Sequence, residues 1–534
     1  MLARKYRNDI LIALAALAIS ACWLPIRMQF PFDDTYITFR YVANLAHGFG
    51  IVWNSGGPHT EGYTNFLFLL LLVPFSAMGW DLIWVSQAIG VVAVVISAIA
   101  ISGIVRPGFT EHIGPMGRMS SMNGTDNSRM AAWFAAALFL LNPLTWINAF
   151  SGMETSLFTM WLLLGFLAFV SNRITLAFVL STLAALTRPE GAVIGFIFLF
   201  VQVTQETKGT KFFSSIGSLM KSAFYCFALP LLVYAAWKLW YFGDLLPNSF
   251  YIKVSQANRA TFLPGRGTIR IFYEGVWYFL PFALLAVWKG RRNVTVQIAA
   301  SWCVLLSAFY LFSQLLQPQY GRFTNSIEAM LILLASIGIA NWKIGRPIIL
   351  LALAGLLVIL NCIWSLYFRG GMGCLTADTE YNDRYRRIAS VFRSIPDREH
   401  ITFAAPDAGI LPYYSGLRNI DVVGLNTSEI ARAHSSAEVI SIILRSRPEL
   451  MLIPFDAHGK PFEGGHGLIG SSYGALQSGA LQAGYRCITV IPQTVYDLNV
   501  LADTTSPHYP DIVNTLVPRI GKDPDFLPPV TKIR

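Results

Sequence analysis

Long stretches without a charged residue, separated by short polar segments, dominate this chain. Of its 534 residues, 54% are hydrophobic and only 13% are charged, whereas soluble domains carry about 25% charged residues. A helix of about 20 apolar residues is long enough to cross the hydrocarbon core of a bilayer. The composition therefore excludes an ordinary soluble protein and predicts a polytopic α-helical membrane protein whose first partner is the lipid bilayer.

The apolar runs set the number of membrane-spanning helices. We expect eleven, at Ile10–Ile26, Leu82–Val105, Met130–Met153, Thr155–Asn172, Ile174–Thr187, Gly191–Gln205, Ser222–Trp237, Gly275–Trp288, Val294–Tyr320, Ala329–Trp342 and Pro347–Phe368. The first run follows basic residues, as a signal peptide would, but no small-residue cleavage site comes after it, so we interpret it as an anchored helix. Several runs are short, so polar residues must lie near their ends or face the bundle interior.

The apolar segment Phe66–Trp80 decides the topology, because its length and Pro74 are compatible with either a span or an interfacial helix. If the segment lies in the interface, the basic clusters of the later loops fall on the same side as the basic N-terminus, as the positive-inside tendency requires. If it spans, every later loop inverts. We therefore expect an interfacial helix at residues 66–80, a cytoplasmic N-terminus and an extracytoplasmic C-terminus.

The composition changes to that of a soluble domain after residue 368. We therefore divide the chain into a transmembrane domain at residues 1–368 and an extracytoplasmic domain at residues 369–534, which ends in a loose, proline-rich tail. Strand patterns and helical spacings alternate in the second domain, which predicts an α/β layer domain. The expected strands are Ile401–Ala405, Asn419–Val423, Leu450–Pro454 and Arg486–Ile491, and the expected helices are Glu380–Arg393 and Ser436–Ser446.

Two adjacent carboxylates, Asp33 and Asp34, stand at the start of the first outward loop, residues 27–65. Adjacent carboxylates repel each other, so at least one of them is expected to find a cation, a hydrogen-bond donor or a proton. Either could then act as the general base for a hydroxyl group. The alternative is that the pair only caps a helix expected at Tyr36–Ala46.

Other polar residues of the outward loops are candidates for substrate binding. They are Arg40, Glu61, Tyr63, Asn65, Glu154, Arg188, Glu190, Asp244, Asn248, Lys253 and Arg322. Arg188, Lys253 and Arg322 could contact a phosphate, because guanidinium offers a planar fork and ammonium a point charge. For Arg188 the alternative is a structural ion pair with Glu190.

Several classes of partner and cofactor are not indicated. The net charge is +10, but much of the excess falls on one side of the membrane in the expected topology, so nucleic acid is not a natural partner. The chain has neither a phosphate-binding loop of the G-x-x-x-x-G-K-[ST] type nor a dinucleotide fingerprint after a strand. The histidines show no ligand spacing. We expect no cofactor, and only a divalent cation on Asp33 and Asp34 stays open.

Six ordered segments carry a family resemblance. They are Asp33–Tyr41, Gly48–Asn54, Glu61–Asn65, Ser151–Thr155, Arg188–Gly191 and Gly243–Asn248. In them the chain resembles the GT-C glycosyltransferases that use polyprenyl-phosphate sugars, and especially the terminal arabinofuranosyltransferases of the mycobacterial cell wall and their bacterial relatives. Two later segments, Pro406–Gly409 and Pro412–Gly416, are similar to the C-terminal domain of that family.

The resemblance implies a GT-C glycosyltransferase in the cytoplasmic (inner) membrane of a bacterium. Such an enzyme would transfer a sugar, by the best match arabinofuranose, from a polyprenyl-phosphate donor to an extracytoplasmic cell-envelope glycan or glycoprotein. By matching position, Asp33 or Asp34 would be the catalytic carboxylate.

Two other classes of function are weighed against this one. A transporter or flippase of lipid-linked sugars would more usually show ionisable residues near helix midpoints or paired broken helices. In the expected topology Lys238 is the only charge well inside an apolar run, and it lies near the outward end. A scaffold that only binds glycan would give Asp33 and Asp34 no function. The sequence therefore favours the enzyme.

Overall fold

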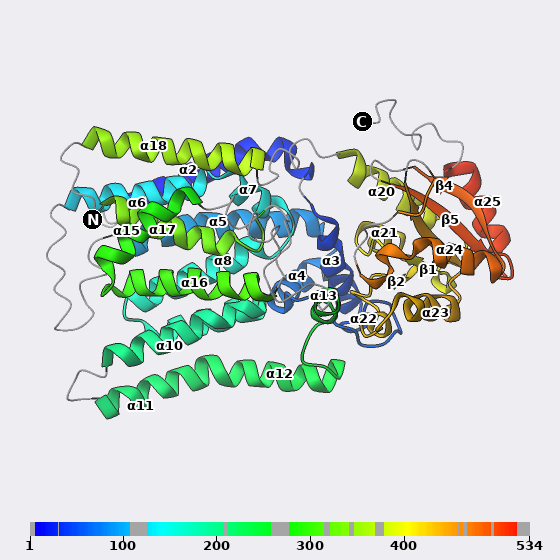
Figure 1. Cartoon of the computed structure of the whole chain (residues 1–534), viewed down its shortest axis with the longest axis horizontal. Helices are drawn as coiled ribbons and strands as arrows, with labels where there is room; N and C mark the ends of the chain where they lie inside the picture. Colours follow the sequence, from blue (N-terminus) through cyan, green and yellow to red (C-terminus); the bar gives the residue numbers. More distant parts are fainter. Residues whose placement is uncertain are drawn as a thin grey trace.

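The structure, a computed structural model, consists of a bundle of long helices with a sheet-containing domain at one end (Figure 1). It describes residues 6–29, 31–106, 125–206, 212–257, 277–313, 321–340, 347–368, 379–456, 459–462, 467–492 and 496–520. Helix α2 (Arg7–Trp23) begins at the end of the bundle that is far from the sheet. The N-terminal part and the C-terminal domain therefore lie at opposite ends of the bundle.

The bundle contains helices of very different lengths. Its further helices are α5 (Leu82–Val105), α6 (Thr125–Leu140), α7 (Pro143–Phe150), α8 (Thr155–Val170), α9 (Ile174–Thr187), α10 (Ala192–Glu206), α11 (Phe212–Ala223), α12 (Leu229–Phe242), α15 (Leu280–Gly290), α16 (Val294–Ser313), α17 (Asn325–Ala340) and α18 (Pro347–Ile363). Among the described residues, four helices are long and apolar enough to cross a membrane, or five if a bent pair counts as one span. The other apolar helices are shorter, so the total of eleven spans stays a prediction.

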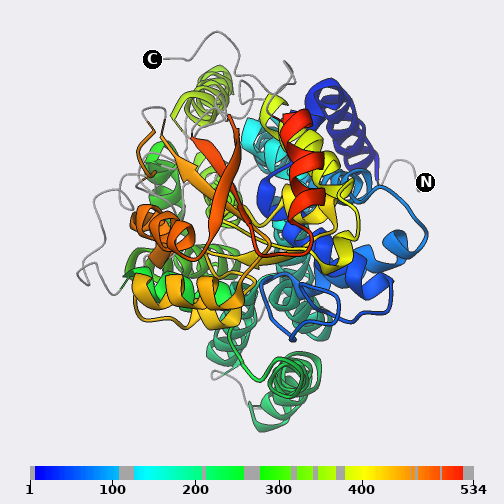
Figure 2. The ribbon, with the colours of Figure 1, turned by 90° about the vertical axis from the view of Figure 1, so that its right-hand side faces the viewer.

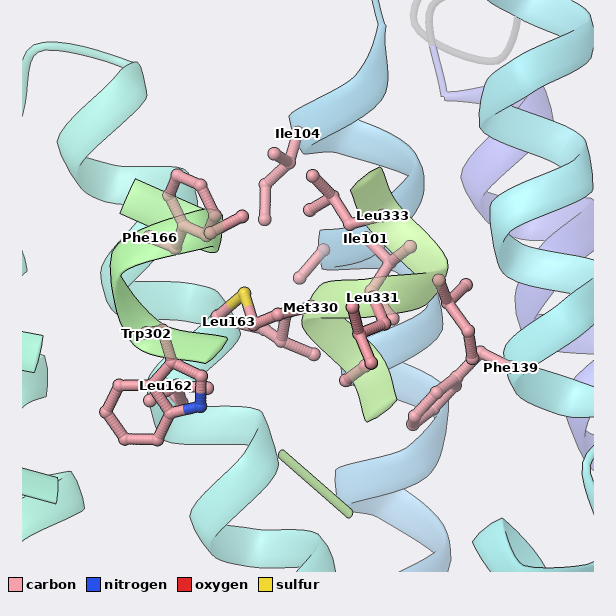
Figure 3. Packing of buried hydrophobic residues seen from close by; sticks show 14 of the residues in the cluster. Ile101, Ile104, Phe139, Leu162, Leu163, Phe166, Trp302, Met330, Leu331 and Leu333 are labelled. Carbon is pink, nitrogen blue, oxygen red and sulfur yellow. The ribbon is translucent and has the colours of Figure 1, made fainter. Parts of the chain in front are cut away.

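The centre of the bundle is packed from side chains of five helices (Figure 3). Phe166 on α8 and Trp302 on α16 are fully buried there and meet residues of α5, α6 and α17. Glycines let backbones come close at two places: an added Cβ would collide with a facing carbonyl at Gly90 and at Gly338. Since lipid tails are as apolar as leucine, close packing of this kind is a main source of helix association within a bilayer.

The run expected as a single helix at Met130–Met153 is broken, which corrects that prediction. Helices α6 and α7 meet at 54°. Pro143 has no N–H and cannot continue the hydrogen-bond ladder of α6, while the side chain of Asn142 caps α7 by accepting a hydrogen bond from Leu144 N. The amide of Asn142 also donates to Glu328 on α17 over 2.9 Å, which fixes the break against a neighbouring helix.

Three short helices form a layer between the bundle and the C-terminal domain: α3 (Asp33–Ala46), α4 (Phe66–Ala77) and α13 (Asn248–Ala257). Helix α4 has only 12 residues. Its buried side chains Phe68, Leu69 and Leu72 belong to the same hydrophobic cluster as α3 and the C-terminal domain. That the segment 66–80 lies in the membrane interface stays a prediction.

The C-terminal domain is built on a mixed sheet in the order β2-β1-β3-β5-β4 among the described residues. The strands are β1 (Thr402–Ala405), β2 (Arg418–Asp421), β3 (Leu450–Phe455), β4 (Tyr485–Ile491) and β5 (Asp497–Asp503). Strands β2, β1 and β3 are parallel, and β5 is antiparallel to both β3 and β4. The four expected strands are thus confirmed within a few residues, and β5 is additional.

Helices cover both faces of the sheet (Figure 2). They are α20 (Thr379–Arg393), α21 (Ile410–Ser415), α22 (Ser428–Ala431), α23 (Ser436–Ser446), α24 (Tyr473–Gln482) and α25 (Tyr509–Ile520). Phe403 and Ala405 face α20 and α25, whereas the intervening Ala404 faces α23 and α24, as the alternation of a strand requires. The helices expected at 380–393 and 436–446 are confirmed as α20 and α23.

Candidate active site

The two adjacent aspartates have different surroundings. Both lie in the first turn of α3, whose N-cap residue is Phe32, so neither aspartate serves as the N-cap. Asp33 Oδ1 accepts a hydrogen bond of 2.8 Å from the backbone N–H of Ile410 in the C-terminal domain. Asp34 Oδ2 lies 3.2 Å from Nη1 of Arg322, and its side chain is 40% exposed. Asp34 is thus the carboxylate that a second molecule can reach.

The environment of Asp33 favours its neutral form. Burial raises the pKa of Asp33, and the negative charges of Asp407 and Asp34 raise it further, while the backbone amides of Ile410 and Gly409 work against this. The two adjacent aspartates therefore lie in different environments: Asp33 faces a backbone amide of the C-terminal domain, and Asp34 faces a guanidinium group.

Arg322 has an unused donor beside Asp34. Its side chain is only 11% exposed, and its Nη1 contacts both Asp34 and, at 3.6 Å, the sulfur of Met153. Its Nε has no hydrogen-bond partner in the part of the chain that the structure describes. A buried donor without a partner costs free energy of about 1–3 kcal/mol, so this nitrogen is a natural site for an anionic ligand.

A second arginine, Arg188, is held by two carboxylates. Its Nη1 lies 3.3 Å from Glu154 and its Nε lies 2.7 Å from Glu190. Asn65 donates a hydrogen bond of 2.9 Å to Glu154, and Tyr310 donates one to Glu190 over the same distance. The ion pair with Glu190 that the sequence leaves open is therefore formed, and the network ties the first outward loop to α8, α9 and α16.

The ring of Phe323 brings the two arginines together. The guanidinium carbon of Arg188 lies 5.0 Å from the centre of this ring, and that of Arg322 lies 5.1 Å from it. Both distances are within the range of a cation–π contact. The end of the bundle that faces the C-terminal domain thus carries two guanidinium groups around one aromatic ring, next to Asp34.

Arg40 binds the C-terminal domain. This buried side chain donates to Pro412 O and, over 2.8 Å, to Leu417 O, both in the C-terminal domain. Its remaining donors contact Trp53 O at 2.8 Å and Asn54 Oδ1 at 3.0 Å. Arg40 therefore fastens α3 to the C-terminal domain and does not meet Asp34.

Glu61 and Tyr63 lie in a buried region beside α12. Glu61 Oε2 is 2.7 Å from Nζ of Lys238, and burial raises the pKa of Glu61 to about 7 against the opposing effect of that lysine. The ring of Tyr63 packs on Tyr41 with centroids 5.1 Å apart, and its buried hydroxyl has no partner among the described residues. Lys238 thus forms an ion pair with Glu61 of the loop at residues 27–65.

The candidates that follow α12 also contact the C-terminal domain. Asp244 forms an ion pair with Arg432, and Asn248 donates to the backbone oxygen of Leu425 over 3.3 Å. Lys253 belongs to α13, but its side chain lies outside the described residues. The predicted residues thus divide into an interdomain group and a group around Asp34.

The structure does not bring together a set of metal ligands. Among the described residues, no three His, Cys, Asp or Glu side chains are placed to hold a metal ion. One oxygen of each aspartate, Oδ1 of Asp33 and Oδ2 of Asp34, contacts an amide and a guanidinium group. The divalent cation that the sequence leaves open on Asp33 and Asp34 stays untested, and no step of the reaction is assigned to one.

Asp407 is the residue at this site that sequence reasoning does not single out. It follows β1 in the loop Pro406–Gly409, and its carboxylate accepts hydrogen bonds from the hydroxyl groups of Tyr385 and Tyr496. Two sequence signals could have pointed to Asp407. It is an acidic residue directly after a strand, and its short segment carries a family resemblance. Asp33 and Asp407 are hundreds of residues apart in the chain, so no local sequence pattern indicates that they lie near each other.

Two family models each match less than half of the chain. Residues 60–261 match the family described as GPI transamidase subunit PIG-U, and residues 377–509 match a domain of unknown function, DUF8728. No curated protein matches the chain in sequence.

Two crystal structures of ArnT from Cupriavidus metallidurans resemble the whole chain. The one bound to undecaprenyl phosphate has a TM-score of 0.57 and 12% identity, and the one in the apo state has 0.53 and 11%. Each alignment covers 94% of this chain and 99% of that structure's chain. The chain therefore shares the polytopic helical fold of these ArnT structures.

Proposed function

We propose that the chain is a membrane glycosyltransferase that takes a sugar from a polyprenyl phosphate and places it on an extracytoplasmic glycan or glycoprotein of the cell envelope. The observation that carries the proposal is the pairing of the accessible carboxylate of Asp34 with Arg322, whose Nε is unused among the described residues. A base for a hydroxyl and a donor for a phosphate thus lie side by side. The likeness in fold to an ArnT structure that holds undecaprenyl phosphate supports the same class of donor.

In the proposed reaction Asp34 accepts the proton of the acceptor hydroxyl while that oxygen bonds to the anomeric carbon of the sugar. The bond between this carbon and the phosphate oxygen breaks, and polyprenyl phosphate leaves with the electron pair. Arg322 binds the phosphate through Nε and stabilises the charge that develops on it. Arg188, which is ion-paired with Glu154 and Glu190, and Lys253 are proposed to contact the same group.

We propose arabinofuranose as the sugar, on the resemblance of the six sequence segments alone. The test is transfer of radiolabelled sugar from synthetic polyprenyl-phosphate arabinofuranose to membrane acceptors, run beside other polyprenyl-phosphate pentoses and hexoses. Transfer from the first donor is the expected result. Transfer only from another donor would withdraw arabinose, and transfer from none of them by folded protein would contradict the glycosyltransferase.

A transporter of lipid-linked sugars is the second candidate, and the broken pair α6 and α7 beside the buried Glu328 favours it. Broken helices with an ionisable partner are common in transporters. One experiment separates the two functions: a transporter moves the donor across a liposome membrane without changing it, whereas the enzyme consumes the donor and forms a glycosidic bond.

We place the protein in the bacterial cytoplasmic membrane with its N-terminus inside and its C-terminal domain outside. The test uses a reporter that is active only outside the cytoplasm. Fused after Arg534, it is therefore expected to give a signal. Fused in the loop after Val105, it is expected to give none. The contacts of the first outward loop with the C-terminal domain require both on one side of the membrane. A signal pattern with the two fusions reversed would contradict this orientation.

A further inference from the structure

The N-terminus of helix α8 lies beside the first turn of α3. In the loop that leads into α8, Ser151 O accepts a hydrogen bond of 2.7 Å from the hydroxyl of Thr35, and a Cβ added to Gly152 would collide with the Thr35 side chain. Gly152 has a φ of +77°, which residues with a side chain rarely adopt. Asp34 precedes Thr35 in the same turn of α3. The start of α8 is therefore a neighbour of the accessible carboxylate of Asp34.

The first turn of α8 is not capped by its own N-cap residue. Glu154 occupies that position, but its side chain makes no hydrogen bond to the helix. Its two oxygens are bonded elsewhere: Oε1 lies 3.3 Å from Nη1 of Arg188, and Oε2 accepts from the amide of Asn65 over 2.9 Å. The first N–H groups of a helix have no partner within it and carry a partial positive charge. Glu154 thus leaves the acceptor position at the start of α8 unfilled.

Thr155, the first residue of α8, places an unused hydroxyl group at this end of the helix. The residue is 1% exposed, and its Oγ1 has no hydrogen-bond partner among the described residues. A buried hydroxyl without a partner costs free energy, so such a group is expected where a ligand supplies the missing bond. The unused Nε of Arg322 belongs to the same place, because Nη1 of this arginine lies 3.6 Å from the sulfur of Met153, two residues before Thr155.

The charges at the start of α8 favour an anion. Two guanidinium groups, those of Arg188 and Arg322, lie next to this N-terminus, where the partial positive charge of the helix disfavours cations. Their carboxylate partners offset part of this repulsion, but they leave the hydroxyl of Thr155 unused. A phosphate has several acceptor oxygens, so it can bond to this hydroxyl, to Nε of Arg322 and to the first N–H groups of α8 at once.

We propose that the N-terminus of α8 is a phosphate-binding site and holds the phosphate of the lipid-linked donor. Thr155 binds the phosphate through its hydroxyl, Arg322 through Nε, and the first turn of α8 through backbone N–H groups. That the phosphate is part of a lipid rests on the proposed glycosyltransferase function. The anion site itself does not, so a lipid phosphate and inorganic phosphate are tested side by side.

Thermal unfolding of the purified protein without ligand separates a binding role of Thr155 from a structural one. Thr155→Val removes the hydroxyl and keeps the shape of the side chain. Thr145→Val is the matched control, because Oγ1 of Thr145 on α7 is also buried and without a partner in the described part of the chain. Both variants are expected to be at least as stable as wild type, because each loses only an unsatisfied hydroxyl. A clear loss of stability in Thr155→Val alone would show a structural role and overturn the inference.

Binding of undecaprenyl phosphate, undecaprenol and inorganic phosphate is then measured on the same proteins. Thr155→Val is expected to bind undecaprenyl phosphate about tenfold more weakly than wild type, which is the effect of losing one hydrogen bond to a charged group. Thr155→Ser, which keeps the hydroxyl, and Thr145→Val are expected to bind it as wild type does. For undecaprenol, which has no phosphate, no difference between Thr155→Val and wild type is expected.

The three ligands keep failure of the site apart from failure of the proposed function. If Thr155→Val and wild type bind undecaprenyl phosphate equally well, the inference is overturned and the proposed function stands. If wild type binds inorganic phosphate but not undecaprenyl phosphate, and Thr155→Val loses that binding, the anion site is supported and the lipid-linked donor is contradicted. Wild type that binds neither phosphate would overturn both.

Discussion

Replacement of Asp34 with asparagine is expected to lower the rate of sugar transfer by about 10²–10⁴-fold, the usual contribution of a general base. The amide keeps the size of the side chain and can still accept a hydrogen bond from Arg322, but it cannot take the proton of the acceptor hydroxyl. Because the side chain of Asp34 is 40% exposed, little change in stability is expected. The measurement is transfer of radiolabelled sugar in membranes at matched expression.

The neighbouring Asp33→Asn is the matched control for this prediction. Asparagine resembles the neutral aspartic acid and its side-chain oxygen can still accept from Ile410 N, so this variant is expected to keep much more activity than Asp34→Asn. Full activity of Asp34→Asn together with an inactive, folded Asp33→Asn would reverse the assignment of the base.

Removal of the Arg40 side chain is expected to give the largest loss of stability, about 3–5 kcal/mol in the free energy of unfolding. Arg40→Ala removes the side-chain donor of Leu417 O and one of the two donors of Trp53 O and of Pro412 O. The measurement is thermal unfolding of the purified protein in detergent, together with hydrogen exchange of the loop after α21. Arg418→Ala, which removes an exposed arginine on β2, is the control and is expected to behave like wild type.

Hydrogen exchange distinguishes a local effect of this change from a global one. If Arg40 fastens the two domains, exchange in Arg40→Ala rises first along α3 and the segment 412–417, where its partners lie. Unchanged exchange in both segments, with a wild-type midpoint of unfolding, would contradict the fastening role of Arg40.

The sequence predicts those parts of the fold that depend on local patterns. Apolar runs and helical spacing locate the bundle helices, α20 and α23, and buried runs locate β1 and β3. Strand β5 is not predicted, although polar and apolar residues alternate at its start, from Asp497 to Val500, as they do in a half-buried strand. The break between α6 and α7 had a local signal in Asn142 and Pro143, which the long apolar run obscured.

The sequence names Asp34, Arg188 and Arg322 but predicts neither Asp407 nor the pairings of the candidate site. The topology argument expects these three residues on one surface, and they lie together around Phe323, while the topology itself stays a prediction. It cannot tell that Arg40 binds backbone oxygens of the C-terminal domain while Arg322 meets Asp34. Such choices depend on which buried acceptors lie within a few ångströms, which follows from packing between segments that are distant in the chain.

The long separation between Arg40 and its partner Leu417 also bears on how the protein is made. The two residues are 377 positions apart, so at a synthesis rate of about 5–20 residues per second the ribosome needs roughly 20–75 s to complete the partner surface after Arg40 has emerged. During that interval helix α3 exposes apolar side chains and a guanidinium group that the finished protein buries. In the orientation proposed above, nascent chains at this stage are a natural substrate for chaperones and quality-control proteases at the outer surface of the membrane.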